Sequence, residues 1–385
     1  MTKKRKKIEC LYVSRYAPNR TRTDPYTGLP WYLSEVTDFI GLWGRGNRPV
    51  PFLKNCKRVF ETNPRWWGLP KSLYSVFKFI RETDQIDTVI CGVDEYSLII
   101  GIFVGKIANA SVFCVVEDPP FTDRYHKLNN IIRRQEKRLR HLFIKSMLKK
   151  CTGIFCFIEK DVLNEFDLDG VPVLQFMNGV STDAIKWVQN HPIEEQDLSE
   201  CIIGYVGAIN KKQGIDDLLN IFAAAKQKVD NLRLRLIGPI DNDYVPCYQK
   251  KLCDLGLDSA VEITGWLPYE KMLEKLQECS ICVHVNPPTQ WFRAAQPLKI
   301  CEYLALGKRT VAWDYPGTRR LLDHGRLGVL IPARNMAAFR DGLIEFSNPM
   351  VRNSVERELH GAICGEWTSD YWYGRVLDIL REGTR

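Results

Sequence analysis

The sequence lacks an apolar run that could span a membrane without interruption. Its longest one, residues 97–116, contains Lys106 and Asn109, and it therefore predicts a buried helix over 97–107 followed by a strand over 111–116. We also expect no secretory leader, because the basic N-terminal run leads into a strand too short for the apolar core of a signal peptide. We therefore expect a cytoplasmic protein.

Paired metal-ligand motifs are also missing. The 13 cysteines are an odd number and come without a leader, which favours a reducing compartment over a disulfide framework. Cys279 and Cys282 have the two-residue spacing of redox and metal sites, but no second pair accompanies them, and Cys282 opens an apolar strand. Buried thiols are the better interpretation, and we expect no bound metal.

Acidic residues are scarce in the first half of the chain. Residues 1–190 carry 30 Lys and Arg against 20 Asp and Glu, whereas residues 191–385 carry 24 against 26. The excess is densest in residues 124–150, where Glu136 is the only acid. The basic residues that crowd there are Arg133, Arg134, Lys137, Arg138, Arg140, Lys145, Lys149 and Lys150.

Apolar residues recur near helical spacing within 124–150, which predicts a basic amphipathic helix. Such a helix is either an ordinary solvated surface helix or one that attracts anionic lipid head groups. Nucleic acid is a weaker alternative, because no aromatic-rich recognition motif accompanies the charge. We therefore expect no nucleic-acid partner.

Strands without polar alternation follow helices along the whole chain, which predicts parallel sheets covered on both faces. Strands are expected at 9–14, 88–91, 111–116, 153–157, 171–176, 202–206, 232–237, 261–264, 281–285 and 308–312. Helices are expected at 31–42, 72–82, 97–107, 161–166, 215–228, 246–255, 271–278 and 297–306, besides the basic helix. The fold class is therefore α/β, with two doubly wound, Rossmann-like domains that face a cleft.

We expect residues 1–185 to form the first domain, the polar segment 186–200 to be a linker, and residues 201–364 to form the second domain. In doubly wound sheets ligands bind beyond the carboxyl ends of the strands. The loops that follow the strands are therefore the place to look for a site.

Residues 296–308 are the most informative stretch of the chain. Pro297 suits the first turn of a helix, and Gly307 suits the left-handed residue that ends one. The exposed N–H groups of such a helix and the neighbouring Lys299 favour a phosphate, while Glu302, one turn further, can accept hydrogen bonds from hydroxyls. Together they predict a site for a sugar nucleotide, unless the helix is merely structural and its charges face solvent.

Read in order, the loops resemble those of a GT-B glycosyltransferase, and specifically of the large retaining glycosyltransferase family 4. The segments that carry the resemblance are 205–209 with 212–214, 236–239, 264–268, 297–307, 317–318, 323–325 and 328–331, together with the Asn178-Gly179-Val180 turn and Trp367. The resemblance implies transfer of a sugar from a nucleotide-diphosphate donor to an acceptor hydroxyl, with retention of configuration and without metal or cofactor. It also implies that residues 1–185 lie on the acceptor side, that residues 201–364 bind the donor, and that a helix within 365–385 returns to the first domain.

The resemblance also assigns residues to the donor site. Gly207 and Gly238 follow apolar strands, where glycine lets backbone N–H groups approach a phosphate, although both glycines could serve turn geometry alone. Trp266 and Leu267 fall in the loop that holds the nucleobase. The segment that binds ribose and diphosphate contributes Pro297, Leu298, Lys299 and Glu302, of which the last binds the ribose hydroxyls.

Three positions depart from the family pattern. Relatives usually carry Arg, Lys and Glu where this chain has Ala208, Gln213 and Ala294, and those groups contact the sugar or its diphosphate. Compensating charge is available from Lys211, Lys212, Arg293 and Lys299, with Lys299 the strongest candidate. The alternative is a non-catalytic GT-B protein that binds a glycan or a protein partner.

On the acceptor side, Tyr26, Thr27 and Gly28 resemble the glycine loop beside the acceptor, unless Gly28 serves a turn only. Asp118 inherits the position that faces the reacting sugar and is the remaining catalytic candidate beside Lys299 and Glu302, unless it caps a helix.

The acceptor is expected to be a glycan or a lipid-linked glycan in polysaccharide or glycoconjugate synthesis. The adjacent Trp66 and Trp67 would suit a first domain that docks peripherally on the cytoplasmic face of an anionic membrane, unless they pack in the core.

Overall fold

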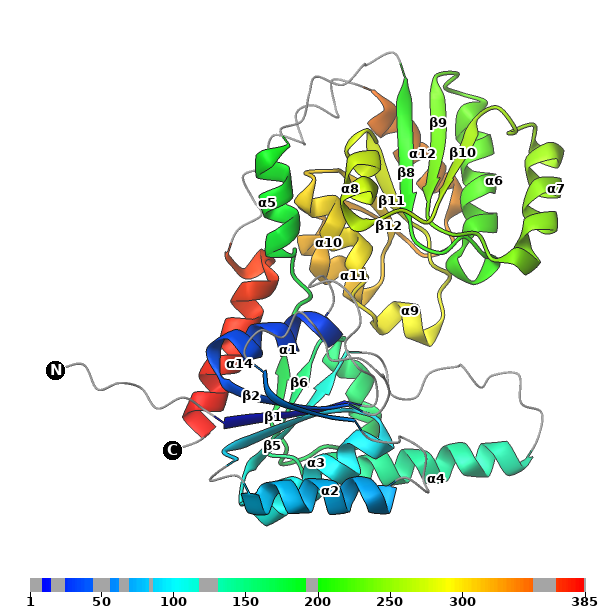
Figure 1. Ribbon diagram of the computed structural model, residues 1–385. Coiled ribbons are helices and arrows are strands. Elements are labelled where there is room, and N and C mark those ends of the chain that lie inside the picture. The colour runs from blue at the N-terminus through cyan, green and yellow to red at the C-terminus, as the bar shows by residue number, and fades with distance from the viewer. Residues whose placement is uncertain are drawn as a thin grey trace. The chain divides into compact units, whose positions relative to one another are not determined.

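The computed structural model divides the chain into two compact units, each built on one parallel β-sheet (Figure 1). The first unit comprises residues 1–177 and 370–385, and the second comprises residues 178–369. The structure describes residues 9–14, 25–43, 56–61, 69–82, 86–117, 131–191, 200–348 and 365–383.

The first unit contains a seven-stranded sheet of order β3-β2-β1-β4-β5-β6-β7. Its strands are β1 (Glu9–Ser14), β2 (Asp38–Trp43), β3 (Cys56–Glu61), β4 (Thr88–Gly92), β5 (Ser111–Val116), β6 (Gly153–Cys156) and β7 (Val173–Gln175). Its helices are α1 (Pro25–Val36), α2 (Leu69–Glu82), α3 (Glu95–Ala108), α4 (Ile131–Leu148), the 3-10 helix η3 (Lys160–Phe166) and α14 (Ser369–Gly383). The strand order reverses at β1, as in a doubly wound sheet.

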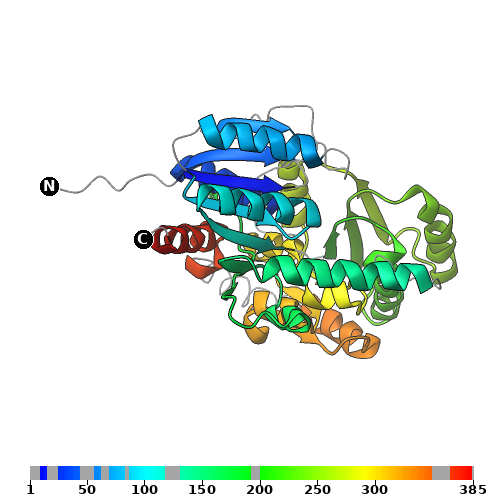
Figure 2. The same ribbon diagram turned by 90° about the horizontal axis from the view of Figure 1, so that it is seen from below.

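Helices cover both faces of this sheet because successive strand residues point to opposite sides. Along β1, Leu11 and Val13 join a core that includes residues of α3 and α4, whereas Cys10 and Tyr12 join one that includes residues of α1 and α14. Figures 1 and 2 show α2, α3 and α4 on one side of the sheet. Because both faces are buried, the central strands β5 and β6 contain no charged residue.

The second unit contains a six-stranded sheet of order β10-β9-β8-β11-β12-β13. Its strands are β8 (Cys201–Val206), β9 (Leu232–Ile237), β10 (Val261–Gly265), β11 (Ile281–His284), β12 (Thr310–Trp313) and β13 (Gly328–Ile331). Its α-helices are α5 (Thr182–Asn190), α6 (Ile215–Lys226), α7 (Val245–Leu255), α8 (Tyr269–Gln277), α9 (Gln290–Ala294), α10 (Leu298–Ala305), α11 (Pro316–Leu321) and α12 (Met336–Ser347). Its 3-10 helices are η4 (Lys211–Gln213), η5 (Asn242–Tyr244), η6 (Asp323–Gly325) and η7 (Gly365–Trp367).

The main core of this unit packs α6, α7 and α12 against one face of the sheet. On the opposite face, the Tyr303 hydroxyl of α10 accepts the N–H of Val206 at 3.0 Å. It also donates to the carbonyl of Val283 at 3.3 Å, so it ties α10 to two neighbouring strands. The predicted α/β fold with two doubly wound parallel sheets is confirmed.

The helix predicted over 31–42 is wrong in its second half. The helix is α1, which begins at Pro25, and after it Asp38–Trp43 form strand β2. Thr37 separates the two elements, because both its hydroxyl, at 2.6 Å, and its N–H, at 2.9 Å, donate to the carbonyl of Leu33. The apolar run continues through both elements, so periodicity alone does not reveal the break.

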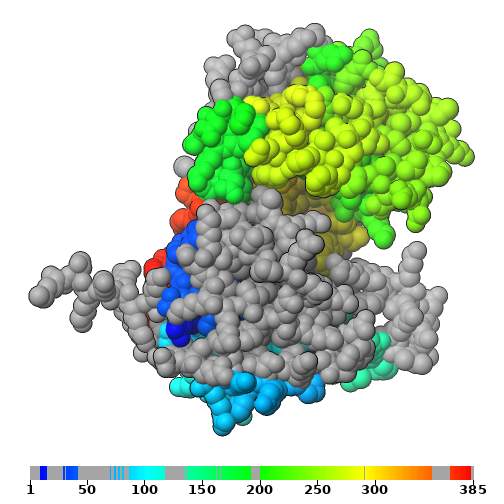
Figure 3. Space-filling view, in the orientation of Figure 1, coloured from blue at the N-terminus to red at the C-terminus, as the bar shows by residue number. Residues whose placement is uncertain are grey.

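The segment predicted as a linker, 186–200, begins within helix α5, and residues 192–199 lie outside the described part. Ser181 caps α5, since its hydroxyl accepts the N–H of Ala184 at 3.0 Å. The side-chain amide of Gln277 donates to the carbonyl of His191 at 2.9 Å, so the end of α5 is held against α8 (Figure 3, green beside yellow-green).

Candidate functional site

The loops that leave the carboxyl ends of β8 and β9 come close together in the second unit. Gly207 and Gly238 have φ of 134° and 146°, which favour glycine. A Cβ on Gly238 would lie 2.1 Å from the carbonyl oxygen of Gly207, so no side chain fits there. The N–H of Gly207 donates to Ile237 at 2.9 Å, so this glycine allows close approach but does not offer its own N–H to a ligand.

Helix α10 brings Lys299 to the same place. Pro297 precedes the helix with φ of −72°, and Lys299 lies in its first turn. The Lys299 Nζ lies 3.1 Å from the Tyr205 hydroxyl and 4.3 Å from the centroid of the Tyr205 ring. It also lies 3.1 Å from the point where a Cβ on Gly207 would be, so the lysine amino group and the glycine turn adjoin each other.

Two other titratable side chains, Glu302 and His284, interact electrostatically with this amino group. Burial lowers the pKa of Lys299 to about 7, although the charge of Glu302 opposes that shift. Burial raises the pKa of Glu302 to about 7, and there the charge of Lys299 opposes the shift. His284 has a lowered pKa because it is buried and because Lys299 lies near, so it is neutral at pH 7. Perturbed pKa values in side chains that lie together at the end of a sheet make this cluster a candidate functional site.

The ring nitrogens of His284 have no hydrogen-bond partner among the described residues, and the side chain is only 1% exposed. The sequence analysis did not single out His284 or Tyr205. Both lie inside apolar strands, where a sequence pattern indicates core residues. Only the packing of α10 over the strand ends shows that they adjoin Lys299.

The first turn of α10 is anchored to the Asn-Gly-Val turn. The backbone N–H of Asn178 donates to the side-chain carbonyl of Gln296 at 2.8 Å. The Asn178 amide group donates to the Gln296 backbone carbonyl at 2.9 Å, and the Cys301 thiol donates to the Asn178 carbonyl at 3.3 Å. These contacts fix where α10 begins, and therefore where Lys299 points.

At two of the three positions that depart from the family pattern, the residue makes a hydrogen bond within the second unit. The Gln213 side chain accepts from the amide of Asn286 at 2.6 Å and so joins η4 to the loop after β11. Ala208 accepts the Tyr205 hydroxyl on its carbonyl at 3.2 Å. Ala294 is buried at 1% exposure, where a carboxylate would lose its hydration.

The other predicted donor-site residues lie at or near the surface of the second unit. Lys211 and Lys212 are exposed on η4, and Arg293 is exposed on α9. Trp266 is 73% exposed after β10, as a ring free to stack on a base would be, and its neighbour Leu267 is half-buried. Pro297 and Leu298 are half-buried. Burial raises the pKa of Tyr315, and the positive charges of Arg293 and Arg334 oppose that rise. Arg334 was not among the residues predicted from the sequence.

The acceptor-side predictions concern the first unit. Tyr26, Thr27 and Gly28 lie in the first turn of α1 and not in a loop, because the helix begins at Pro25. Asp118, Trp66 and Trp67 lie outside the described residues. Their predicted roles remain predictions.

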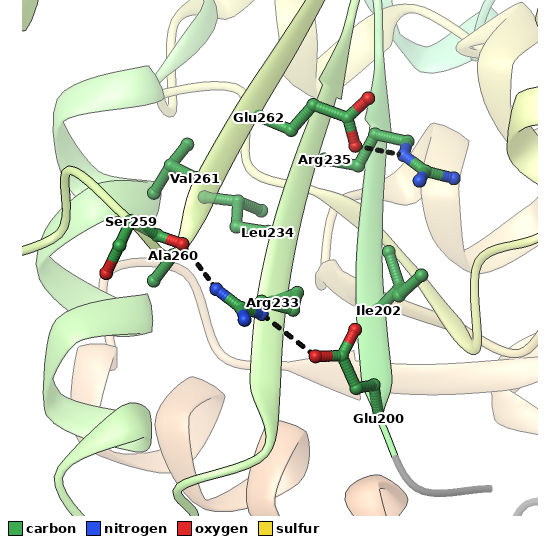
Figure 4. A pocket seen from close by; sticks show the side chains of 9 residues that line it. All are labelled: Glu200, Ile202, Arg233, Leu234, Arg235, Ser259, Ala260, Val261 and Glu262. Carbon is green, nitrogen blue, oxygen red and sulfur yellow. Dashed lines mark hydrogen bonds and ion pairs between the residues drawn. The ribbon is translucent and has the colours of Figure 1, made fainter. Parts of the chain in front are cut away.

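A hollow in the second unit lies at the amino ends of β8, β9 and β10 (Figure 4). It measures about 250 Å³ and is lined by Arg233, Arg235 and seven neighbours. Carboxylates already neutralise both arginines, since Glu200 pairs with Arg233 at 3.2 Å, and Glu262 and Glu278 pair with Arg235 at 2.7 and 2.5 Å. It therefore lacks free charge for an anion.

The described residues contain neither a group of three or more side chains placed to hold a metal ion nor a helix long and apolar enough to cross a bilayer.

Comparison with known proteins agrees with this architecture. Residues 200–348 match the family described as Glycosyl transferases group 1. No curated protein matches the chain. A glycosyltransferase from Rickettsia africae is 14% identical with a TM-score of 0.73, over 98% of this chain and 99% of that one.

Two further solved structures are similar over almost their whole length. Sucrose-phosphate synthase from Thermosynechococcus elongatus is 13% identical with a TM-score of 0.73, over 97% of this chain and 98% of that one. HepE from Anabaena, in complex with UDP, is 13% identical with a TM-score of 0.70, over 97% of this chain and 100% of that one. The chain therefore has the GT-B fold. Its second unit is similar to the glycosyl transferases group 1 family over residues 200–348.

Replacing Lys299 with Met should stabilise the protein at neutral pH. The pKa of Lys299 falls from 10.5 to about 7 on folding, so the unfolded chain binds more protons between these values. Below pH 7 the charged Lys299 side chain lowers the free energy of unfolding by its full amount. This destabilisation disappears as the pH rises towards 10.5. We expect Lys299→Met to raise Tm by roughly 2–4 °C for each kcal/mol regained at pH 7, with a smaller gain at pH 9.

Scanning calorimetry from pH 6 to pH 9 measures this. Lys271→Met is the control, because Lys271 pairs with Glu274 at 2.8 Å and is exposed. A Lys299→Met protein that is less stable than the wild type throughout this range would contradict the account.

Proposed function

We propose that this protein transfers a sugar from a nucleoside-diphosphate sugar to an acceptor hydroxyl, with retention of anomeric configuration. The observation that carries the proposal is the Lys299 amino group, held beside the Gly207 turn with Glu302 three residues further along α10. A half-buried cation at the carboxyl edge of a doubly wound sheet suits an anionic ligand. Retention, and the absence of a cofactor or metal from the proposed reaction, follow the resemblance to family 4.

In this reaction the bond between the anomeric carbon and the diphosphate oxygen breaks, and charge develops on the departing diphosphate. Lys299 is placed to stabilise that charge, with Lys212, Lys211 and Arg293 as further candidates at the surface. Glu302 in its ionised form accepts hydrogen bonds from the ribose hydroxyls, and the exposed Trp266 ring is available to the base. A nucleoside diphosphate is a good leaving group, so strong acid catalysis is not needed.

Donor turnover tests this proposal. HepE was crystallised with UDP and with UDP-glucose, so uridine nucleotides are the first to try. We expect one sugar nucleotide in a panel to raise Tm and to release its nucleoside diphosphate. Lys299→Ala should lower kcat/KM by about 100-fold or more, as does the loss of one preorganised charge-stabilising donor, and Glu302→Ala should mainly raise KM. Lys271→Ala is the matched surface control.

Catalysis is refuted if no sugar nucleotide binds or turns over and both site variants behave as the wild type does. The alternative is then a non-catalytic GT-B protein that binds a glycan or protein partner. Two observations favour that alternative. Gln213 carries no charge and accepts a hydrogen bond from Asn286, and Ala294 is buried where a carboxylate would lose its hydration.

We further propose that the acceptor is a glycan or a lipid-linked glycan, presented at an anionic membrane on the cytoplasmic side. On α4 the side chains of Leu139 and Leu142 are 66% and 51% exposed, and a spacing of three places them on one helix face. Lys145 and Lys149 pair with Asp167, but Arg138 and Lys150 are exposed beside this face. Apolar side chains flanked by cations suit the surface of an anionic bilayer.

Co-sedimentation with lipid vesicles measures this interaction. At low salt the full chain should pellet with phosphatidylglycerol vesicles and not with phosphatidylcholine vesicles. Replacing Leu139 and Leu142 with Ser should lower the partition constant by about 100-fold or more, because each loses roughly 1.5–3 kcal/mol of apolar burial. Tyr74→Ser, which removes a 69% exposed ring from α2, is the control. Equal recovery on both kinds of vesicle would contradict the proposal.

A further inference from the structure

Tyr205 has an unusual environment for a core residue of a β-strand. Its side chain is fully buried in β8, yet its hydroxyl lies between two polar groups of the candidate site. The hydroxyl donates to the Ala208 carbonyl at 3.2 Å and accepts from Lys299 Nζ at 3.1 Å. Because the only proton of a phenol is used by the Ala208 carbonyl, the oxygen lone pairs are left to face the lysine.

The ring of Tyr205 supports the same amino group. Lys299 Nζ lies 4.3 Å from the ring centroid, within the range of a cation–π interaction. The adjoining Gly207 keeps the space open, because a Cβ there would lie 3.1 Å from Nζ and 3.3 Å from the hydroxyl. Hydroxyl, ring and glycine together hold the amino group at the end of β8.

Besides Tyr205, two titratable groups face Lys299, one from its own helix and one from β11. Glu302 lies on α10 itself, and His284 ends β11. His284 is neutral at pH 7, and Glu302 has a pKa raised to about 7 by burial, so a fixed negative charge does not hold the lysine. Tyr205 supplies its hydrogen bond instead.

We propose that Tyr205 is a positioning residue, which holds the Lys299 amino group over the Gly207 turn so that this one lysine anchors the diphosphate of the donor. The inference rests on the proposed function, since the donor supplies the anion. It explains how the site can bind a diphosphate although Ala208 and Gln213 carry no charge. The positive charge comes from Lys299 on α10, and Tyr205 on β8 fixes the position of that charge.

The proposal has a measurable proton balance. An ammonium group has three N–H donors, so Lys299 can keep its bond to Tyr205 and direct the other two to phosphate oxygens. The diphosphate favours the charged amine, so binding takes up a proton wherever the free site holds Lys299 neutral. Affinity should therefore fall as the pH rises above 7, by up to about tenfold per pH unit.

Titration calorimetry of the full chain with UDP, from pH 6.5 to pH 9 in two buffers of different ionisation heat, tests the proposal. GDP and ADP replace UDP if UDP does not bind. Tyr205→Phe removes the hydroxyl and keeps the ring. It should weaken binding by about tenfold at pH 7 and move the alkaline loss of affinity to lower pH, because the charged amine loses an acceptor. Tyr244→Phe, which loses a buried bond to Asp216, should bind as the wild type does.

A double-mutant cycle separates positioning from folding. In the Lys299→Met background, Tyr205→Phe should have no further effect on UDP affinity, because Tyr205 acts through the lysine. Because Lys299→Met is expected to stabilise the protein, Tyr205→Phe can be studied in this background even if Tyr205→Phe alone is unstable.

Unchanged affinity and an unchanged pH profile in Tyr205→Phe would overturn this inference and leave the proposed function intact. An equal loss in both backgrounds would overturn it as well, by assigning Tyr205 a structural role. A wild-type protein that binds none of the three nucleotides removes the proposed function and the inference together.

Discussion

The amino group of Lys299 is half-buried against Tyr205, and the chemistry of the second unit depends on that placement. An amine at the surface would carry its charge at neutral pH and gain little from a bound anion. Here burial lowers the pKa of Lys299 to about 7, so a diphosphate could restore the charge and be held by it. Tyr205, His284 and Glu302 surround the amine without neutralising it permanently.

The sheet makes this burial possible. Parallel strands end at one edge, and there the chain needs glycine, because Gly207 and Gly238 approach each other too closely for a side chain. Helix α10 starts beside this edge because Gln296 is tied to Asn178 by two hydrogen bonds. The position of one lysine is thus set by a strand end, a glycine turn and the start of a helix.

Much of this arrangement could be predicted from the sequence. Apolar strands bounded by turn residues, such as β5 and β6, and the helix between Pro297 and Gly307 carry local signals that packing does not override. The break at Thr37 could not be predicted, because the apolar pattern runs through it and the decisive hydrogen bonds return to Leu33. Strand β3 was likewise missed.

The site shows the same division between local and long-range signals. Lys299 and Glu302 were identified because a helix start carries its own pattern. Tyr205 and His284 were missed because their significance depends on contacts with a helix far along the chain, and a buried tyrosine in an apolar strand looks like core. The sequence shows that Ala208, Gln213 and Ala294 lack the charges that relatives carry at these positions. Only the structure shows that Gln213 accepts a hydrogen bond from Asn286.

A crystal structure of the full chain with UDP, or with GDP or ADP if that nucleotide stabilises it more, tests the central claim most directly. The account predicts a diphosphate oxygen within hydrogen-bonding distance of Lys299 Nζ, with the ribose hydroxyls at Glu302. A nucleotide bound elsewhere in the protein, with Lys299 still on Tyr205 and no phosphate beside it, would contradict the account.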